Sequence, residues 1–306
     1  MKAVVLKGSG SADKLIPAEV EKPTPKDTEL LIKVHAGTVT RGDVFLRKIP
    51  AFIVVPLGFF FGFKRMKIPG IEFSGTVEDT GTSVTLFKKG DRVFGTTTGL
   101  KYGANAEYVC IPEKRKTGVV AKMPENLSFE EAAAIPVGGM TALCILQKAH
   151  VGKGQKVLIY GASGSVGTSA IQLAKHLGAE VVGVCSTRNV DLVTSIGADR
   201  VIDYTKEDFT KNGERHDLIF DAVGKISKAK CRGSLKENGK YRSIRTPTKE
   251  RPEDLIFLKT LAEAGRLRPV IDRHYALDQV PEAHRYVEQG HKRGNVVIRI
   301  VDEEKS

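Results

Sequence analysis

Three glycines, Gly161, Gly164 and Gly167, stand at the turn between a short apolar run and a helical pattern. The run before them, Lys156–Tyr160, has the length and composition of a buried strand. The apolar residues after them recur at helical spacing, and Gly178 stands where a helix-ending glycine is expected. Glycines at such a turn let the backbone approach a pyrophosphate, whose charge the following helix N-terminus favours. The pattern indicates a dinucleotide-binding turn, although its G-x-x-G-x-x-G spacing also suits a tight strand–helix turn without a ligand.

The next expected strand, Glu180–Cys185, carries no acidic residue at its end. NAD-binding folds usually place an acid there to hold the ribose hydroxyls, and here the first acid is Asp191, inside the next helix. Instead, Ser186, Thr187 and Arg188 follow the strand. Two hydroxyls and a guanidinium can hold a 2′-phosphate. The sequence therefore favours NADP(H) over NAD(H), the alternative being that Arg188 is a solvated residue at a helix start.

Strands and helices alternate from residue 154 onward. The expected strands are Lys156–Tyr160, Glu180–Cys185, Arg200–Ile202, Asp217–Asp221 and Lys240–Ile244. Such alternation predicts a parallel sheet with helices on its faces. The chain should then continue with a helix over Leu255–Ala264, a strand at Pro269–Ile271, a helix over Val280–Gln289 and a strand over Asn295–Val301.

Residues 1–125 are expected to be mostly β-structure. Apolar runs bounded by Gly, Pro and Asp lie at Ala3–Leu6, Glu29–Val34, Phe73–Val77, Arg92–Phe94 and Glu107–Ile111. Ser128, with Glu131 three residues later, has the spacing of a capping box that begins a helix. Pro136 and a glycine pair should interrupt that helix before a second one, over Thr141–Lys148.

Composition is that of an ordinary globular protein of 306 residues, with 41% apolar and 27% charged residues. The net charge of +12 is scattered, which favours a solvated basic surface over a dedicated nucleic-acid face. The four cysteines show no C-x-x-C pair and are expected to be isolated buried thiols. The apolar stretch Ile49–Phe63 is broken by prolines and glycines, so it should form a loop and not a membrane span. With no signal peptide apparent, the cytoplasm is the expected location.

Several motifs in a fixed order resemble one known family. They are Pro69–Gly75, Gly90–Gly95, Gly103–Tyr108, Glu130–Pro136, the glycine turn, Ile196–Asp199 with Ile202–Tyr204, and Val270–Arg273. Together they resemble the medium-chain dehydrogenase/reductase superfamily, in its zinc-free, quinone oxidoreductase-like (zeta-crystallin-like) branch. The resemblance implies an α/β chain with a GroES-like catalytic domain (1–125), a Rossmann NADP(H)-binding domain with a doubly wound parallel sheet (126–265), and a C-terminal return to the first domain (266–306). The active site would lie in the cleft between the domains.

The positions that hold catalytic zinc in some relatives differ here. The first ligand would fall near Thr40 and Arg41, and the usual His-Glu pair is Ile71 and Glu72. Isoleucine cannot bind zinc, and a catalytic site needs three protein ligands, so no metal is expected. Without a Lewis acid, the resemblance implies NADPH-dependent hydride transfer to an activated acceptor, a quinone or an α,β-unsaturated carbonyl.

The same resemblance supplies candidate site residues. Thr40, Arg41 and Asp43 would lie on the loop facing the nicotinamide: Thr40 as a hydrogen-bond donor where many relatives have Asn, Arg41 as a cation for the reduced acceptor or a surface residue, and Asp43 as a residue that orients the loop. The cofactor-binding residues would be Thr141, Gly161, Ser163, Gly164, Ser165, Val166, Gly167, Ser186, Thr187, Arg188, Tyr204, Val223 and Gly224. No general acid stands out, so solvent is expected to supply the proton. The apolar segment Phe52–Phe63 suits either a wall of the substrate site or core packing.

Two departures from the family pattern leave alternatives open. Between Ser243 and Asp254 the chain is short, so the sixth strand of the sheet is expected to be absent unless residues are missing from the sequence, and either a homodimer or a monomer is compatible. At Gly294–Asn295 relatives commonly have Gly-Lys. The asparagine in this chain therefore removes a possible cation beside the cofactor. A zinc-free alcohol dehydrogenase-like enzyme and a non-catalytic NADP(H)-binding redox sensor or RNA-binding protein are the alternative functions.

Overall fold

The computed structural model describes residues 1–50, 67–100 and 103–300. Their contacts define two compact units, each built from separate parts of the chain. The first unit contains Met1–Val137, Glu250–Glu263 and Ile271–Ser306, and the second contains Gly138–Lys249 and Ala264–Val270. The expected loop over Ile49–Phe63, with its proposed substrate wall Phe52–Phe63, lies almost entirely outside the described residues.

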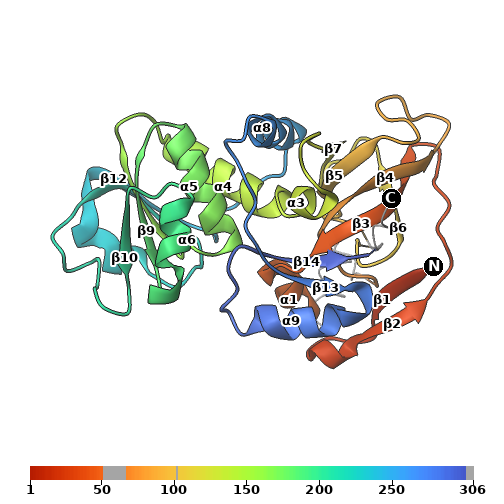
Figure 1. Ribbon diagram of the computed structural model, residues 1–306, viewed down its shortest axis with the longest axis horizontal. Helices are drawn as coiled ribbons and strands as arrows, with labels where there is room; N and C mark the ends of the chain where they lie inside the picture. Colours follow the sequence, from red (N-terminus) through yellow and green to blue (C-terminus); the bar gives the residue numbers. More distant parts are fainter. Residues whose placement is uncertain (51–66, 101–102, 301–306) are drawn as a thin grey trace. The chain divides into compact units, whose positions relative to one another are not determined.

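A seven-stranded sheet forms the centre of the first unit, with strands in the order β13-β14-β3-β4-β5-β7 and with β6 also paired to β3 (Figure 1). Its strands are β3 (Glu29–Thr38), β4 (Glu72–Thr80), β5 (Arg92–Thr96), β6 (Tyr108–Pro112), β7 (Val120–Lys122), β13 (Ile271–Ala276) and β14 (Asn295–Arg299). A separate antiparallel pair is formed by β1 (Lys2–Leu6) and β2 (Leu15–Glu19). The side chains of β6 alternate between buried and half-buried, as expected of a strand with one face toward a core.

Short helices complete the first unit. They are α1 (Arg41–Lys48), α3 (Phe129–Ala133), α8 (Pro252–Glu263) and α9 (Val280–Glu288), with 3-10 turns at Ala12–Lys14 and Leu277–Gln279. The expected capping box of Ser128 and Glu131 is present at α3, and a second one, formed by Thr40 and Asp43, begins α1. Each box satisfies backbone N–H groups that a helix start leaves free, which is why both helices begin where they do.

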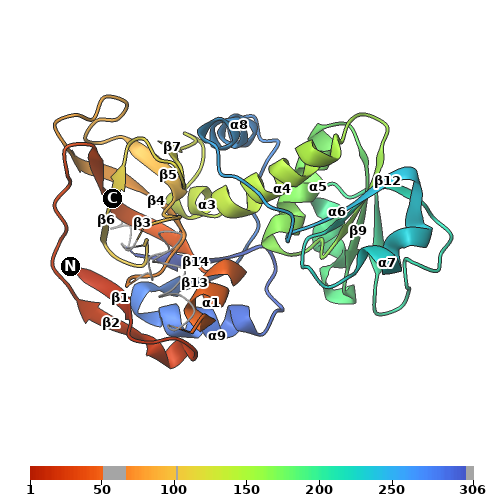
Figure 2. The same ribbon diagram turned by 180° about the vertical axis from the view of Figure 1, so that it is seen from behind.

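The second unit is a five-stranded parallel sheet in the order β10-β9-β8-β11-β12. Its strands are β8 (Lys156–Tyr160), β9 (Glu180–Cys185), β10 (Arg200–Asp203), β11 (His216–Asp221) and β12 (Leu235–Ser243). Helices α5 (Ser165–His176) and α6 (Val190–Ser195) pack on β8, β9 and β10, and α7 (Lys228–Cys231) lies beside β12 (Figure 2). Short 3-10 turns at Thr187–Asn189 and Arg232–Ser234 complete the unit. Its core strands β8 and β9 are buried almost continuously, which fits a parallel sheet covered on both faces.

Several expected elements differ from the structure. Helix α4 (Pro136–Ala149) begins at Pro136, not at Thr141, because proline suits the first turn of a helix and the glycine pair is accommodated within it. A Cβ on Gly138 would lie 2.6 Å from Ser165 Oγ, so glycine permits the close approach of α4 to α5. The strand expected at Pro269–Ile271 was wrong: β13 begins at Ile271. The sequence patterns did not predict α1, β2 or β7.

Strand β12 is an edge of the parallel sheet in the described part of the chain, where no sixth strand follows it. Residues 244–251 connect β12 to α8 without a strand or helix. The short segment identified in the sequence thus corresponds to a sheet of five strands. No helix within the described ranges combines the length and apolar character needed to cross a bilayer.

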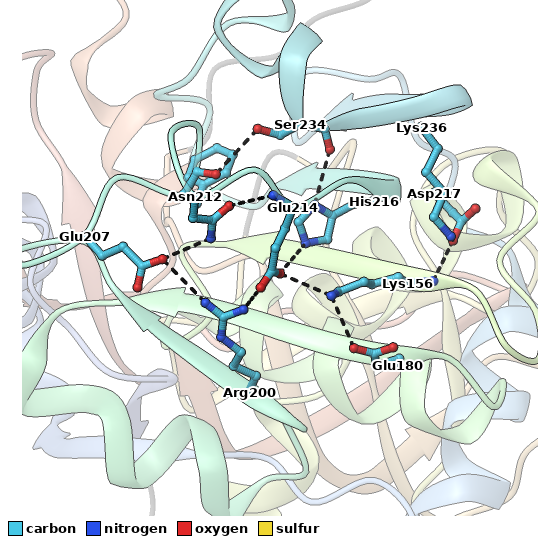
Figure 3. Close-up of polar contacts among 11 residues, drawn as sticks. Lys156, Glu180, Arg200, Glu207, Asn212, Glu214, His216, Asp217, Ser234 and Lys236 are labelled. Atoms are coloured by element: carbon cyan, nitrogen blue, oxygen red, sulfur yellow. Dashed lines mark hydrogen bonds and ion pairs between the residues drawn. The ribbon is translucent and has the colours of Figure 1, made fainter.

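A charged cluster holds together the strand starts at the amino edge of this sheet (Figure 3). Glu214 pairs with Arg200 and with Lys156, whose Nζ lies 3.1 Å from Glu214 Oε2 and 3.5 Å from Glu180 Oε1. His216 is fully buried beside them, its Nδ1 3.3 Å from the carbonyl oxygen of Ser234. Burial lowers the pKa of His216 to about 4. These groups lie at the opposite ends of the strands from the glycine turn.

Candidate functional site

The glycine turn connects β8 to α5 and is shaped by backbone contacts that leave no room for side chains. A Cβ on Gly167 would lie 2.2 Å from Gly161 O, and a Cβ on Gly161 would lie 2.7 Å from Val223 Cγ1. Gly161 also has a positive φ of 81°. At Gly164, by contrast, the nearest heavy atom to a Cβ would be 3.6 Å away, so space is open there. The turn thus combines two tightly packed glycines with one that faces free space.

Helix α5 begins at this turn without a side-chain cap. Gly164 is its N-cap residue and supplies no capping hydrogen bond, and the 12-residue helix continues with Ser165 and Val166. The N-terminus of such a helix carries unpaired N–H groups and a positive dipole end, both of which favour an anion. Open space at Gly164 and the uncapped helix start together fit the pyrophosphate of a dinucleotide.

The residues expected to hold the adenosine end gather after β9. Asn189 Nδ2 donates to Ser163 Oγ at 3.0 Å and to Ser186 Oγ at 3.2 Å, which joins the glycine turn to the end of the strand. The Tyr204 side chain is 54% exposed, and its backbone N–H donates to Cys185 O at 3.0 Å. The structure therefore brings these expected residues to one edge of the sheet.

An acidic residue also lies at this edge. Thr187 Oγ1 donates to Asp203 Oδ2 at 2.5 Å, and Thr205 Oγ1 donates to Asp203 Oδ1 at 2.7 Å. These hydrogen bonds, that from Thr187 foremost, lower the pKa of Asp203 to about 2, so its carboxylate is charged at neutral pH. No acid stands at the end of β9, but Asp203 at the end of β10 places a carboxylate at the same edge of the sheet.

Asp221 organises the loop after β11. Its Oδ1 accepts hydrogen bonds from the backbone N–H groups of Val223 at 3.0 Å and Gly224 at 2.8 Å, and its Oδ2 accepts one from Ile226 at 2.9 Å. Arg245 Nη2 donates to Gly224 O at 3.0 Å. Val223 and Gly224 are thus held in a fixed turn, with Val223 packed against Gly161. Thr141 lies, partly exposed, in α4, one turn beyond the contact of Gly138 with Ser165.

In the first unit, the residues expected on a loop instead begin helix α1. Thr40 is the N-cap, and its Oγ1 donates to Asp43 Oδ2 at 2.6 Å. Asp43 Oδ1 accepts a hydrogen bond from the backbone N–H of Ile71 at 3.1 Å. Burial raises the pKa of Asp43, although these hydrogen bonds oppose the shift. Both carboxylate oxygens of Asp43 are occupied by donors that fix the start of α1 against the segment before β4.

A second buried acid, Glu72, lies next to this helix start. Glu72 Oε1 accepts a hydrogen bond from the backbone N–H of Val137 at 2.6 Å, and Oε2 accepts one from Thr38 Oγ1. Glu72 is fully buried, which raises its pKa to about 7, and the charge of Asp43 adds to the shift. Lys292 opposes it. In sequence, Glu72 stands out only as the remaining half of a metal-ligand pair.

Lys292 and Arg41 are two of the cations that lie in this region of the described chain. Lys292 is partly buried and donates from Nζ to the carbonyl oxygen of Gly294. Burial lowers its pKa to about 8, while the charges of Glu72 and Asp272 oppose the shift. Arg41 is exposed, and its Nη1 would lie 3.2 Å from a Cβ on Gly290, so the two cations border the same loop. Lys292 appeared in the sequence only as part of a Lys-Arg pair typical of a surface.

No three His, Cys, Asp or Glu side chains gather into a possible metal site within residues 1–50, 67–100 and 103–300. Glu72 stands at a position that binds metal in some relatives. Here its carboxylate accepts hydrogen bonds from Thr38 Oγ1 and from the backbone N–H of Val137.

Comparison with known proteins agrees with this architecture. Residues 26–151 match the alcohol dehydrogenase GroES-like domain, and residues 165–268 and 240–298 match two models of zinc-binding dehydrogenases. The chain is 35% identical to a 2-methylene-furan-3-one reductase of Solanum lycopersicum, over 97% of this chain and 79% of that protein. It is 31% identical, with the same coverage, to a chloroplastic NADPH-dependent alkenal/one oxidoreductase of Arabidopsis thaliana.

Among solved structures, the quinone oxidoreductase from Coxiella burnetii superposes with a TM-score of 0.87 at 30% identity, covering 98% of this chain and 99% of that one. A parallel dinucleotide-type sheet, a GroES-like unit and these relatives define the class. The chain belongs to the medium-chain dehydrogenase/reductase superfamily.

Proposed function

We propose that this protein is an NADPH-dependent oxidoreductase that transfers a hydride to a quinone or an α,β-unsaturated carbonyl without a metal ion. The observation that carries the cofactor assignment is the uncapped start of α5 beside the open space at Gly164. The class of acceptor is supported by the activities of the relatives, a 2-methylene-furan-3-one reductase, an alkenal/one oxidoreductase and a quinone oxidoreductase.

NADPH, when bound, supplies the hydride and both electrons of the reduction. Gly161, Gly164 and Gly167, with Ser165 and Val166, would hold its pyrophosphate at the α5 N-terminus. Ser163, Ser186, Thr187, Arg188 and Tyr204 would contact the adenosine end, and Thr141, Val223 and Gly224 the nicotinamide end. Their contribution is to fix one geometry for transfer, which lowers the entropic part of the barrier.

Residues of the first unit would line the site that binds the hydride acceptor. Thr40 and Asp43 occupy each other's hydrogen-bonding groups, so their proposed role is to hold the start of α1 in place. Arg41 is exposed at the first position of that helix and can stabilise negative charge on the reduced acceptor. Activated acceptors need less electrophilic help than simple alcohols and ketones, which suits a site without zinc.

We also propose that the protein acts in the cytoplasm, on a small apolar carbonyl or quinone. Its scattered positive charge is assigned to a solvated surface and not to nucleic-acid binding.

The test is steady-state NADPH oxidation with 1,2-naphthoquinone and a panel of enones, for the wild type and Gly164→Ala. An alanine at Gly164 meets only an ordinary contact with the protein but enters the space assigned to the pyrophosphate. We expect turnover by the wild type, and NADPH affinity at least about tenfold lower in the variant, since one close contact of this kind is worth more than about 1.4 kcal/mol.

The matched control is Gly152→Ala, whose new Cβ would meet nothing within 4 Å. It should bind NADPH like the wild type. Tight NADPH binding without turnover of any acceptor would contradict the enzyme assignment and favour a redox sensor. Turnover of simple alcohols with NADP+ but of no quinone or enone would favour the alcohol dehydrogenase alternative.

A further inference from the structure

A groove of about 550 Å³ lies in the first unit, lined by helix α8, strand β7 and the loops that precede β5 and β7 (Figure 1). Every residue of its lining belongs to this unit, and none is among those proposed to bind NADPH or the acceptor. Sites for small molecules have volumes of roughly 300 to 1,000 Å³. The groove is therefore large enough for a small molecule, and hydride transfer does not use it.

Much of the lining is apolar and continues the core of the unit. Val120 and Ala121 of β7 are buried, and Phe87 packs against the core cluster to which Val120 belongs. Leu86 and Ile256 also line the groove but are 57% and 53% exposed. One exposed apolar side chain is ordinary, whereas a group of them around a hollow indicates a binding surface. Covering these side chains would be favourable for an occupant with an apolar part.

Helix α8 presents one face to this groove. Pro252, Ile256 and Lys259 all line it, and their spacing of four and three residues places them on the same side of the helix. Leu255 and Leu258, on another side, are fully buried and attach α8 to the rest of the protein. The face with Ile256 is thus not needed to hold the helix, and it carries an apolar residue one turn before a cation.

Hydrogen bonds fix two parts of the lining to the same segment, Thr96 to Thr98. Glu250, two residues before α8 begins, accepts from Thr96 Oγ1 and Thr98 Oγ1, each at 2.9 Å. Arg115, in the loop before β7, donates from Nη1 to Thr96 O at 2.6 Å and from Nη2 to Thr98 O. The start of α8 and the loop before β7 are therefore held in place without a ligand, and a site formed in advance binds at lower entropic cost.

The charges of the lining favour an anion. Its one acid, Glu113, accepts hydrogen bonds from the backbone N–H groups of Thr85 at 2.6 Å and Leu86 at 3.2 Å, which shapes the loop before β5. Four cations face this single acid, namely Lys114, Arg115, Lys122 and Lys259.

Lys114 is the cation best suited to meet a ligand. Lys122 pairs with Asp91 at 3.1 Å and Lys259 with Glu263 at 3.4 Å, so part of their charge is neutralised. Lys114 is exposed, and its side chain forms no ion pair with any part of the chain that the structure describes. A second copy of this chain fits less well, because each molecule carries a net charge of +12 and the groove adds to the repulsion.

We propose that this groove is a binding site for an amphipathic anion, an aliphatic carboxylate of the fatty-acid type. Its hydrocarbon chain would cover Leu86, Ile256 and the apolar part of β7, and its carboxylate would meet Lys114. The site is separate from the proposed catalytic residues, so the proposal does not depend on the proposed function.

The test is isothermal titration calorimetry of the cofactor-free chain with dodecanoate, below the concentration at which it forms micelles. Dodecyltrimethylammonium has the same chain with the opposite charge, and acetate has the carboxylate without the chain. We expect saturable binding of dodecanoate, at least about tenfold tighter than that of the cation, because the rim attracts one and repels the other. Acetate should not bind measurably, and added salt should weaken the binding of dodecanoate.

Two variants with matched controls locate the binding. Ile256→Glu places a charge in the apolar lining and should weaken binding at least about tenfold. Ile16→Glu makes the same change at an isoleucine of β2 that is 41% exposed and outside the groove, and should bind like the wild type. Lys114→Glu should weaken binding about three- to tenfold, since it reverses one partly screened charge. Lys7→Glu, at an exposed lysine outside the groove, is its control.

Three results would overturn the proposal. The first is no binding of dodecanoate, and the second is equal binding of dodecyltrimethylammonium. The third is an unchanged affinity in Ile256→Glu, which would place the ligand elsewhere. A wild-type dimer that Ile256→Glu dissociates, with no dodecanoate bound, would assign the groove to a second copy instead. Circular dichroism of each variant verifies folding, and all four substituted residues are exposed.

Discussion

The carboxylate of Asp203 lies beside the hydroxyls proposed to bind the 2′-phosphate of NADPH. Hydrogen bonds from Thr187 and Thr205 keep it ionised, with a pKa of about 2. A negative charge at this place repels a phosphate and so would reduce the preference for NADPH proposed to come from Ser186 and Arg188. On this proposal, opposing charges from the ends of two strands set the cofactor preference.

Replacing Asp203 with Asn should therefore strengthen NADPH binding relative to NADH. We expect the ratio of the two dissociation constants to shift toward NADPH by about three- to tenfold, less at high salt because exposed charges are screened. Fluorescence titration with both cofactors at two salt concentrations measures the ratio.

Asp199→Asn is the matched control, since Asp199 immediately precedes β10 and Asp203 ends it. It should leave the ratio unchanged. A ratio that moves toward NADH in Asp203→Asn would show that the carboxylate serves to hold Thr187 and not to oppose phosphate.

The sequence could predict residues that belong to one continuous motif. Ser186, Thr187 and Arg188 directly follow the expected strand. Their order in the sequence is therefore enough to predict that they lie at the same edge of the sheet. Asp203, Glu72 and Lys292 are different, because each acts on a partner far away in the chain. A lysine in a Lys-Arg pair is typical of a surface, and only tertiary structure shows that this one is partly buried near two carboxylates.

At the scale of elements, the stability of the amino edge of the parallel sheet depends on His216 remaining uncharged. Burial lowers its pKa from 6.5 to about 4, so the folded state resists protonation between these values while the unfolded state accepts a proton. The unfolded state then binds more protons, and the free energy of unfolding falls as pH decreases from about 6.5 toward 4. Above pH 6.5 this contribution is fully present.

His216→Gln should remove this part of the pH dependence. On the order of 3 kcal/mol of the wild type's loss between pH 6.5 and 4 comes from His216, at 1.36 kcal/mol for each unit of pKa. Chemical denaturation followed by circular dichroism across this range measures it, with the variant less stable at pH 7 but flatter in its pH profile.

His150→Asn is the control, at an exposed residue with a positive φ of 57°, a conformation that Asn tolerates. Its pH profile should parallel that of the wild type. A profile of His216→Gln that also parallels the wild type would mean that other groups, such as half-buried His35 and buried His284, account for the acid sensitivity.

Element boundaries were predictable where local signals agree. Strands β8 and β9 have the predicted bounds, because an apolar run between turn residues fixes both ends. The predicted start of α4 was wrong because a proline usually breaks a helix, whereas Pro136 occupies a first-turn position where its missing N–H costs nothing. Helix α1 was missed although Thr40 and Asp43 have capping-box spacing, because Asp replaces the usual Glu or Gln.

At the scale of the whole molecule, the parallel sheet ends at β12 with charged residues along the strand. Lys236, Glu237, Lys240 and Arg242 lie within the nine residues of this strand, with a glycine among them. An edge strand exposes unpaired backbone groups, and charges along it oppose pairing with a second copy. We therefore expect a monomer of 33.3 kDa in light scattering coupled to size exclusion.

Removing those charges should permit association. A Lys236→Val, Glu237→Val double variant is expected to form larger species, while Lys88→Val, Lys89→Val, at exposed turn positions, should remain monomeric. A wild-type chain that runs as a stable dimer at micromolar concentration would contradict the assignment of β12 as a free edge.

The exposed edge of β12 affects how strongly molecules of this protein repel one another in solution. The barrier to edge-to-edge contact is electrostatic, and it adds to the repulsion between molecules that each carry a net charge of +12. Salt shortens the range of both, to about 8 Å at physiological ionic strength. Colloidal stability should therefore be greatest in dilute buffer, and concentrated salt should bring the molecules together first along this strand.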